Sequence, residues 1–322
     1  MLQAKTNDTN VVPSQAQAQP QVPLTASPAE ACQVHQETFK LASTDGMRLH
    51  VYSWTGALTP DKVVIVIHGM GGHSGYYNDS LAPYLVPTGA AVYAPDLRGH
   101  GHSEGSRGDI PSFEHYQRDV EAVVRWARLR HPGLPVFLLG ESMGTSIAIV
   151  YAACATAEIR PDGLILVACV VAPTLKPRFD EFVRTFWYAS HNRLKVVLPI
   201  TGREEQGIRD MAFVKVLKTD ALFNRYVSVR FLTSMTSNMS RAARLHKQLH
   251  LPVLLLQGGL DITVRHRPTR TFFKRIAATD KEMYVFPEAF HAILNDPDAP
   301  LVRRRILDWL QRQTTNHSQT TH

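Results

Sequence analysis

The sequence predicts an α/β fold with a doubly wound, mostly parallel sheet and one helical insertion. Short, unbroken runs of β-branched and other apolar residues recur along the chain, as expected of strands that are covered on both faces. Segments with helical periodicity separate these runs, and strands that alternate with helices form βαβ units. With 322 residues, the chain is long enough for one large α/β domain or two smaller ones.

The chain is expected to begin with a disordered tail. Residues 1–34 lack Phe, Trp and Tyr and are rich in Gln, Ala, Pro and Thr, so they cannot bury enough surface to offset chain entropy. Two β-type runs, 37–41 and 48–54, then flank Thr44-Asp45-Gly46, which is an Asp-Gly hairpin signal. A hairpin therefore precedes the parallel sheet.

Six apolar runs follow as candidate buried strands. They are Val63–Ile67, Ala91–Ala94, Val136–Leu139, Leu164–Val167, Val253–Leu256 and Met283–Phe286. The clearest helical period between them runs from Phe113 to Ala127, after the start signals Pro111 and Ser112. A further helix is expected over 268–278. Strands and helices thus alternate through most of the chain.

One segment breaks this alternation. Residues 172–250 hold several helical periods and no convincing strand, so we interpret them as an inserted helical cap, called the cap segment below. The core is then expected to comprise residues 35–171 and 251–314, with 315–322 as a flexible tail. An aromatic stripe in the cap segment is compatible with core packing and with a wall of a substrate pocket: Phe179, Phe182, Val183 and Phe186.

The positive charge is concentrated in the same segment. The chain carries a net charge of +7, and residues 172–250 contain 14 Lys and Arg against 6 Asp and Glu. No helix-turn-helix, RNA-binding or zinc-finger pattern accompanies this charge, so a nucleic-acid partner is not expected. The basic residues form either a solvated face or a peripheral contact with an anionic membrane surface.

Cysteine content and hydropathy indicate the cellular compartment that the sequence favours. Cys32, Cys154 and Cys169 show no CxxC or metal-ligand spacing, so neither a disulfide framework nor a metal site is indicated. The longest apolar stretch, 163–173, is far shorter than the roughly 20 residues of a membrane helix. No signal-peptide pattern precedes Phe39. We therefore expect a cytoplasmic protein without a metal or cofactor.

The main chemical motif follows a predicted strand. Gly140-Glu141-Ser142-Met143-Gly144 lies between the run 136–139 and a helix-compatible segment, which is G-x-S-x-G in a strand-turn-helix context. Glycines are needed because the turn is tight. Ser142 would be a nucleophile at a helix N-terminus, where the backbone N–H of Met143 faces a developing oxyanion. The alternative is a plain glycine-rich turn.

A second glycine-containing turn also follows a predicted strand. The run 63–67 ends in His68-Gly69-Met70-Gly71, and this turn would direct the backbone N–H of Met70 toward the same oxygen. The alternative interpretation is a flexible turn without a chemical role. Met70 and Met143 are therefore the candidate oxyanion-hole residues.

These two motifs, together with Asp96-Leu97-Arg98-Gly99-His100-Gly101-His102-Ser103-Glu104-Gly105, resemble the α/β-hydrolase superfamily and, within it, the monoacylglycerol lipase and lysophospholipase group. The resemblance covers residues 38–311. It implies the α/β-hydrolase fold and the chain order Ser, then Asp after a late strand, then His after the last strand. Asp261 and His291 match those positions.

A serine hydroxyl needs an imidazole to take its proton, and a carboxylate to fix the imidazole tautomer. Asp280 and Asp96 are the rivals of Asp261. However, Asp280 precedes its strand, and Asp96 is expected to form an ion pair with Arg98. Two departures leave the subfamily open, because Glu141 stands where many members carry His and Thr145 where Gly is common.

We therefore predict a serine hydrolase that cleaves carboxylic esters of single-chain lipids through an acyl-enzyme. Three enzymatic alternatives use the same triad: a thioesterase, a peptidase and an acyltransferase. An alternative of another class is a non-catalytic binding protein on the same scaffold, although no triad or oxyanion element is missing from the sequence. The expected partner is a small-molecule lipid ester.

Overall fold

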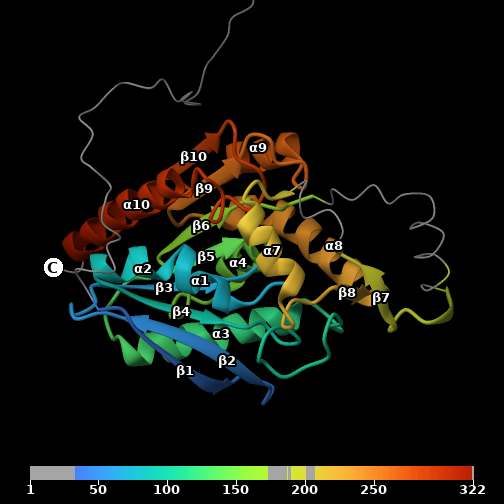
Figure 1. Ribbon diagram of the computed structural model, residues 1–322. Coiled ribbons are helices and arrows are strands. Elements are labelled where there is room, and N and C mark those ends of the chain that lie inside the picture. The colour runs from blue at the N-terminus through green and yellow to red at the C-terminus, as the bar shows by residue number, and fades with distance from the viewer. Residues whose placement is uncertain (1–32, 173–186, 188–189, 201–206, 321–322) are drawn as a thin grey trace, which may run out of the picture.

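The computed structural model describes residues 33–172, 187, 190–200 and 207–320. The predicted N-terminal tail, apart from residues 33 and 34, and the aromatic stripe of the cap segment lie outside these residues. An eight-stranded sheet runs through the middle of the molecule with helices on both faces (Figure 1). This arrangement is the predicted doubly wound α/β fold.

The strands follow the sequence prediction closely. In the sheet their order is β1-β2-β4-β3-β5-β6-β9-β10. Their bounds are β1 His35–Ala42, β2 Arg48–Thr55, β3 Lys62–Ile67, β4 Ala90–Pro95, β5 Val136–Glu141, β6 Gly163–Val167, β9 Val253–Gly258 and β10 Lys281–Phe286. The β1–β2 and β2–β4 pairs are antiparallel and the other pairs are parallel. The carboxyl ends of the six parallel strands therefore meet at one edge.

The helices complete two separate cores. Their bounds are α1 Tyr77–Ser80, α2 Ala82–Leu85, α3 Glu114–Arg130, α4 Met143–Cys154, α7 Met211–Thr219, α8 Val229–Arg244, α9 His266–Arg275 and α10 Ala299–Thr320. Along β3, Val63 and Ile65 pack with α3 and α4, whereas Val64 and Val66 pack with α2 and α10. Successive side chains of a strand point to opposite faces. Burial on both faces explains why the strands are apolar at every position.

The C-terminal end corrects the expected flexible tail at 315–322. Helix α10 continues to Thr320, because its buried face extends past residue 312. Gln313 and Thr314 are both buried, and Gln313 Nε2 donates to Asp280 Oδ2 at 2.7 Å. The polar composition of this segment favoured a flexible tail, whereas the helix packs here through a few polar side chains.

The cap segment contains a small sheet as well as helices, which corrects the expectation of no strand. Strands β7, Val196–Pro199, and β8, Tyr226–Ser228, pair antiparallel with each other. With 4 and 3 residues, they are too short to show an alternating pattern in the sequence. Helix α7 lies between the two strands in the chain, and α8 follows β8 directly (Figure 1).

The expected Asp96–Arg98 ion pair is also wrong. Arg98 Nε donates to Asp119 at 2.7 Å and its Nη1 donates to Asp45 at 2.8 Å. Asp96 instead accepts backbone N–H groups of Ser74 and His102, both at 2.8 Å. The neighbours in sequence point apart, because Asp96 ties two loops together while Arg98 binds the hairpin and α3. Within the described residues, no helix has the length and hydropathy to span a membrane.

Candidate active site

The sharp turn between β5 and α4 places Ser142 at the carboxyl edge of the sheet. Ser142 has φ 51° and ψ −118°, a conformation that few residues other than glycine adopt. The two flanking glycines allow the turn. A Cβ on Gly144 would lie 2.1 Å from the carbonyl oxygen of Ile67, and one on Gly140 would lie 2.6 Å from that of Gly144. The G-x-S-x-G spacing thus lets the helix start directly against β3.

The structure brings Ser142, His291 and Asp261 together. Ser142 Oγ lies 2.8 Å from His291 Nε2, and His291 Nδ1 lies 2.8 Å from Asp261 Oδ2. An ionised carboxylate only accepts hydrogen bonds, so Nδ1 donates to Asp261 and Nε2 is left to accept from the serine hydroxyl. The rival Asp280 binds Gln313 instead. It precedes β10, whereas Asp261 follows β9.

Asp261 is held by several donors. Its Oδ1 accepts the backbone N–H groups of Thr263 at 2.7 Å and Val264 at 3.0 Å, and its Oδ2 also accepts Gln257 Nε2 at 2.8 Å. Burial by itself raises the pKa of this carboxyl. The hydrogen bond and charge of His291, together with the two backbone donors, outweigh burial and hold the pKa of Asp261 below its ordinary value.

The imidazole shows the complementary shift. Burial lowers the pKa of His291, but the hydrogen bond and charge of Asp261, with a smaller contribution from Glu141, raise it above the ordinary 6.5. The side chain of His291 remains 17% exposed, so it faces a space that solvent can enter. Its backbone N–H donates to the carbonyl of Gly207 at 2.9 Å, which links it to the cap segment.

The two candidate oxyanion donors lie on either side of Ser142. Met143 is the first residue of α4, where the first backbone N–H groups of a helix have no partner within it. On the other side, a Cβ on Gly69 would lie 3.3 Å from Ser142 Cβ. The turn that carries Met70 is therefore packed directly against Ser142.

Glu141, which the sequence marked only as a departure, is partly buried near the imidazole. Tyr77 Oη donates to Glu141 Oε2 at 2.7 Å. Burial raises the pKa of Glu141, while the hydrogen bond from Tyr77 and the charge of His291 oppose the rise. A carboxyl group here adds negative potential around His291. The sequence carried no sign of this contact, because Tyr77 lies 64 positions away.

Two residues of the cap segment reach the loops around the site. The backbone N–H of Asn224 donates to the carbonyl of Gly71, and its Nδ2 donates to that of Gly99, both at 2.8 Å. Asp220 binds His73 Nε2 at 2.8 Å and also accepts from Tyr76 Oη. Sequence reasoning missed both residues, because nothing in their local pattern points to loops more than 100 positions away.

The described residues contain no group of three His, Cys, Asp or Glu side chains that could hold a metal ion. The site as described is built from a serine, an imidazole and a carboxylate, with backbone N–H groups nearby. Such an arrangement can transfer a proton from the hydroxyl to the imidazole as the oxygen attacks an electrophilic carbon.

Comparisons with known proteins identify the family of the chain. The family model described as serine aminopeptidase S33, a hydrolase family, matches residues 59–298. Human monoglyceride lipase is 32% identical over 267 residues, which cover 80% of this chain and 84% of the relative. A monoacylglycerol lipase of Mycolicibacterium smegmatis is 27% identical over 274 residues, with 84% of this chain and 95% of the relative covered.

Among solved structures, the monoacylglycerol lipase of Paleococcus ferrophilus superposes with a TM-score of 0.72 at 27% identity. The match covers 82% of this chain and 99% of that one. The chain therefore belongs to this α/β-hydrolase family. Within the family it is a carboxylic ester hydrolase of the monoacylglycerol-lipase-like group.

Proposed function

We propose that the chain is a serine hydrolase that works through an acyl-enzyme, with Ser142 as nucleophile, His291 as general base and acid, and Asp261 as the group that orients the imidazole. The observation that carries this proposal is the continuous chain of two 2.8 Å contacts from Ser142 Oγ through His291 to Asp261. The raised pKa of His291 suits a group that must accept a proton.

The reaction follows from these positions. Ser142 Oγ attacks the ester carbonyl carbon, and the hydroxyl proton passes to His291 Nε2. The attack converts the carbonyl group of the ester into a tetrahedral oxyanion. The backbone N–H groups of Met70 and Met143 donate to that oxygen. When the C–O bond breaks, the alcohol leaves with the proton from His291. Water then repeats the attack on the acyl-serine, releases the acid and regenerates the hydroxyl.

A fluorophosphonate probe tests the nucleophile. We expect the wild type to be labelled at Ser142, and Ser142→Ala to lose both labelling and ester turnover. Ser237→Ala is the matched control, because Ser237 is an exposed serine on α8. Labelling at another serine with turnover retained in Ser142→Ala would refute the assignment.

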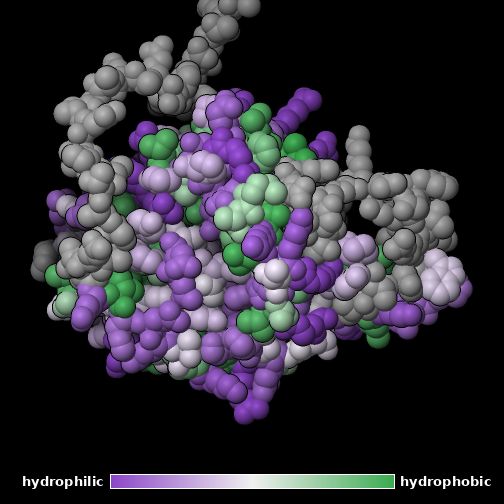
Figure 2. All heavy atoms as spheres, in the orientation of Figure 1, coloured by the Kyte–Doolittle hydropathy of each residue, from purple (hydrophilic) through white to green (hydrophobic). Residues whose placement is uncertain are grey.

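We propose esters of single-chain lipids, monoacylglycerols or lysophospholipids, as substrates. The relatives named above are monoacylglycerol lipases, and a Bacillus subtilis relative at 28% identity is named a phospholipase. Apolar side chains also gather over α7 in Figure 2. Met211 and Val216 on α7, and Leu260 and Ile262 beside Asp261, are large and about half exposed or more.

These apolar groups lie near the triad. Gly207, four residues before Met211, accepts from the backbone N–H of His291, and a Cβ on Gly207 would lie 3.4 Å from Thr263 Oγ1. The start of α7 and the loop of Asp261 therefore adjoin each other. An apolar rim at this place suits an acyl chain better than a charged or strongly hydrated substrate.

The substrate test compares kcat/KM for a monoacylglycerol, a lysophospholipid, a triacylglycerol and a short water-soluble ester. We expect the two single-chain lipids to be preferred, because three acyl chains cannot enter one slot together. Preference for the triacylglycerol, or equal rates on all substrates, would refute the proposal. A matched thioester and an aminoacyl amide distinguish the thioesterase and peptidase alternatives, and transfer to an added alcohol distinguishes the acyltransferase.

We also propose peripheral contact of the cap segment with an anionic membrane surface. Its net charge of +8 follows from the 14 basic and 6 acidic residues. Part of this charge is used internally, because Arg209 pairs with Asp296 and Asp298, and Arg230 pairs with Asp109. Lys215 and Lys247 are exposed and are the residues on which we base the proposed contact.

A further inference from the structure

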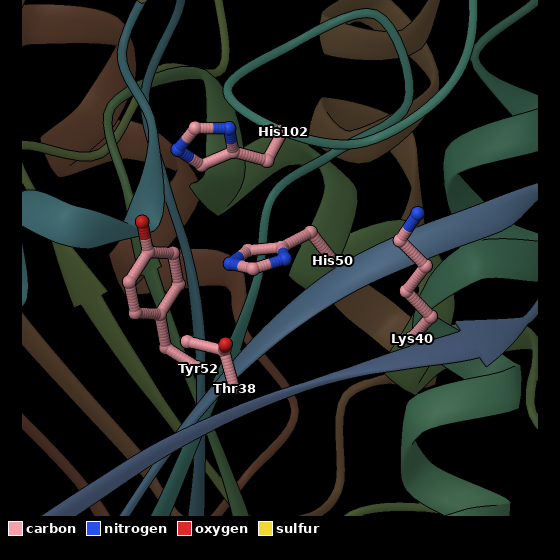
Figure 3. A pocket seen from close by; sticks show the side chains of 5 residues that line it. All are labelled: Thr38, Lys40, His50, Tyr52 and His102. Atoms are coloured by element: carbon pink, nitrogen blue, oxygen red, sulfur yellow. The ribbon is translucent and has the colours of Figure 1, made fainter.

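A hollow of about 460 Å³ lies on the outer face of the β1–β2 hairpin, apart from the triad. Thr38 and Lys40 on β1, and His50 and Tyr52 on β2, line it together with His102 from the loop after β4. Figure 3 shows His50 between Tyr52 and Lys40, with His102 on its far side from Thr38. The proposed hydrolysis uses none of these residues.

The hairpin register explains why these side chains meet. Thr38 pairs directly with Tyr52, and Lys40 pairs directly with His50. Two cross-strand pairs that are two residues apart place all four side chains on the same face of the hairpin. The sequence pattern H-x-Y facing T-x-K therefore builds one wall of the hollow.

Backbone hydrogen bonds fix the loop against this wall. The N–H of His50 donates to Ser103 Oγ, and the N–H of Asp96 donates to the carbonyl of His50, both at 2.8 Å. The N–H of His102 donates to Asp96 Oδ2. The imidazoles of His50 and His102 are thereby held with ring centroids 5.1 Å apart. Hydrogen bonds of the main chain position the two rings. The ring nitrogens take no part in these hydrogen bonds.

All five lining side chains end in a hydroxyl, an imidazole or an ammonium group, which are hydrogen-bond donors, and no carboxylate is among them. Within the described residues, none of these five polar ends has a hydrogen-bond or ion-pair partner. The carboxylate of Glu104, farther along the same loop, pairs with Arg48. The hollow is thus lined by hydrogen-bond donors that have no acceptor among the described residues.

The electrostatics of the hollow are compatible with an anionic ligand. Burial lowers the pKa of His50, and the charges of His102 and Lys40 lower it further, whereas Asp96 opposes the shift. Tyr52 stays protonated and able to donate, because burial and the charges of Asp96 and Asp220 raise its pKa to about 12. A bound anion would favour the charged form of His50 beside Lys40 and accept hydrogen bonds from the hydroxyls.

We propose that this hollow binds a phosphate group. A tetrahedral oxyanion offers acceptors in several directions, which matches donors that come from two strands and a loop. The volume of the hollow leaves room for an organic substituent on one oxygen. The phosphate belongs either to a soluble phosphate monoester or to a phosphomonoester lipid headgroup, and these sources share the same recognition chemistry.

The first experiment titrates the full-length protein with inorganic phosphate and follows the imidazole signals of the histidines by NMR. We expect saturable shifts of the His50 and His102 signals and an upward change of the pKa of His50. His50→Gln and His102→Gln should each weaken binding about tenfold or more, because each removes an imidazole that can donate to the anion. His35→Gln is the matched control on β1, since His35 lies on the same hairpin outside the hollow. Thermal unfolding checks that all variants are folded.

Sulfate stays doubly charged between pH 6 and pH 8, so its affinity reports the protonation of the protein alone. Binding should strengthen as the pH falls, because His50, whose pKa burial lowers, then becomes charged. Ser142→Ala should bind phosphate like the wild type, which separates this site from the proposed hydrolysis. Absence of saturable binding, or equal losses in His35→Gln and His50→Gln, would overturn the proposal.

Vesicles distinguish the two sources of phosphate. Vesicles that contain phosphatidic acid carry a phosphomonoester, whereas vesicles of equal charge with phosphatidylserine carry a phosphodiester. A preference for phosphatidic acid that disappears in His50→Gln assigns a lipid headgroup. Equal binding to both vesicles, with saturable binding of inorganic phosphate and of glycerol 3-phosphate, assigns a soluble ligand. In either case the phosphate group binds in the same hollow.

Discussion

The sheet and the cap segment contribute to the site in different ways. Ser142, Asp261 and His291 lie at or just after the ends of β5, β9 and β10, and β5 and β9 are almost wholly buried. The cap segment reaches the same place through separate polar contacts of Asn224, Asp220 and Arg209. The sheet therefore fixes positions by packing on two cores, whereas the cap segment combines apolar packing of its own with individual hydrogen bonds and ion pairs to distant loops.

This difference indicates how each region responds to change. A side chain at a buried strand end is held by the whole sheet, so substitutions of the triad should affect chemistry without disturbing the fold. A polar contact of the cap segment joins loops that are far apart in the sequence, so its loss should alter the geometry of those loops.

The triad partners should show the largest effect. His291→Ala and Asp261→Asn should each lower kcat by about 10⁴-fold or more, because the three residues act as a unit. Asp280→Asn is the control, since Asp280 lies at the other end of the strands. Steady-state kinetics and thermal unfolding should show lost turnover with nearly unchanged stability. Near-normal turnover in Asp261→Asn, together with an inactive Asp280→Asn, would mean that the acid is wrongly assigned.

Asn224 should affect turnover more than a matched asparagine does. Asn224 and Asn238 are both 5% exposed, but Asn224 binds the loops at Gly71 and Gly99, whereas Asn238 donates to Ser146 within the helices. Removal of either side chain should cost about 1–3 kcal/mol of unfolding free energy. Asn224→Ala should in addition lower kcat by about tenfold, because the lost side-chain bond to Gly99 lets the backbone of residue 224, which holds the oxyanion turn at Gly71, shift.

The measurement is kcat, KM and the free energy of unfolding for both alanine variants. If kcat falls equally in Asn224→Ala and Asn238→Ala, the effect is general destabilisation and Asn224 does not position the turn. Asn224→Asp refines the test, because it loses the side-chain donor to Gly99, as alanine does, but keeps a side chain of nearly the same size and leaves no cavity.

Substitution of Glu141 should have a smaller effect, which the pH dependence of activity should show. His291 must be neutral to accept a proton, and its pKa is raised, so activity should be lost as pH falls through a value above 6.5. Glu141→Gln removes a negative charge near the imidazole and should move this acid limb to lower pH. The kcat/KM profile measures the shift. A limb that stays in place would show that Glu141 is neutral or screened.

Vesicle binding should show the smallest effect. Co-sedimentation with anionic vesicles should weaken as salt is added, because exposed charges are screened over about 8 Å at physiological ionic strength. The pair Lys215→Gln and Lys247→Gln should reduce binding more than Arg270→Gln with Lys274→Gln on α9, which removes the same charge outside the cap segment. Equal binding to neutral vesicles would leave the basic residues as a solvated face.

The sequence predicted the parts of the fold that depend on local pattern. The run 63–67 is apolar at every position because helices cover both of its faces, and the glycines at 140 and 144 report a close approach to neighbouring backbone. The position of His291 after the last strand was likewise visible in the sequence.

The remaining features depend on contacts far apart in the chain. Arg98 pairs with Asp45, 53 positions away, and with Asp119, 21 positions away, so its neighbour Asp96 was the wrong partner. Strands β7 and β8 stabilise each other and have no pattern of their own. The extension of α10 depends on Gln313 reaching Asp280, which no local propensity records.

The backbone of Ser142 implies a trade-off between stability and function. Within the described chain, Ser142 and Ala168 are the two residues other than glycine with positive φ, both at 51°, and they end the neighbouring strands β5 and β6. Such a conformation costs on the order of 1–3 kcal/mol. Glycine at 142 would relieve this cost and remove the hydroxyl, whereas glycine at 168 would relieve a similar cost and leave the hydroxyl in place. Selection for heat resistance can therefore act on residue 168 but not on residue 142.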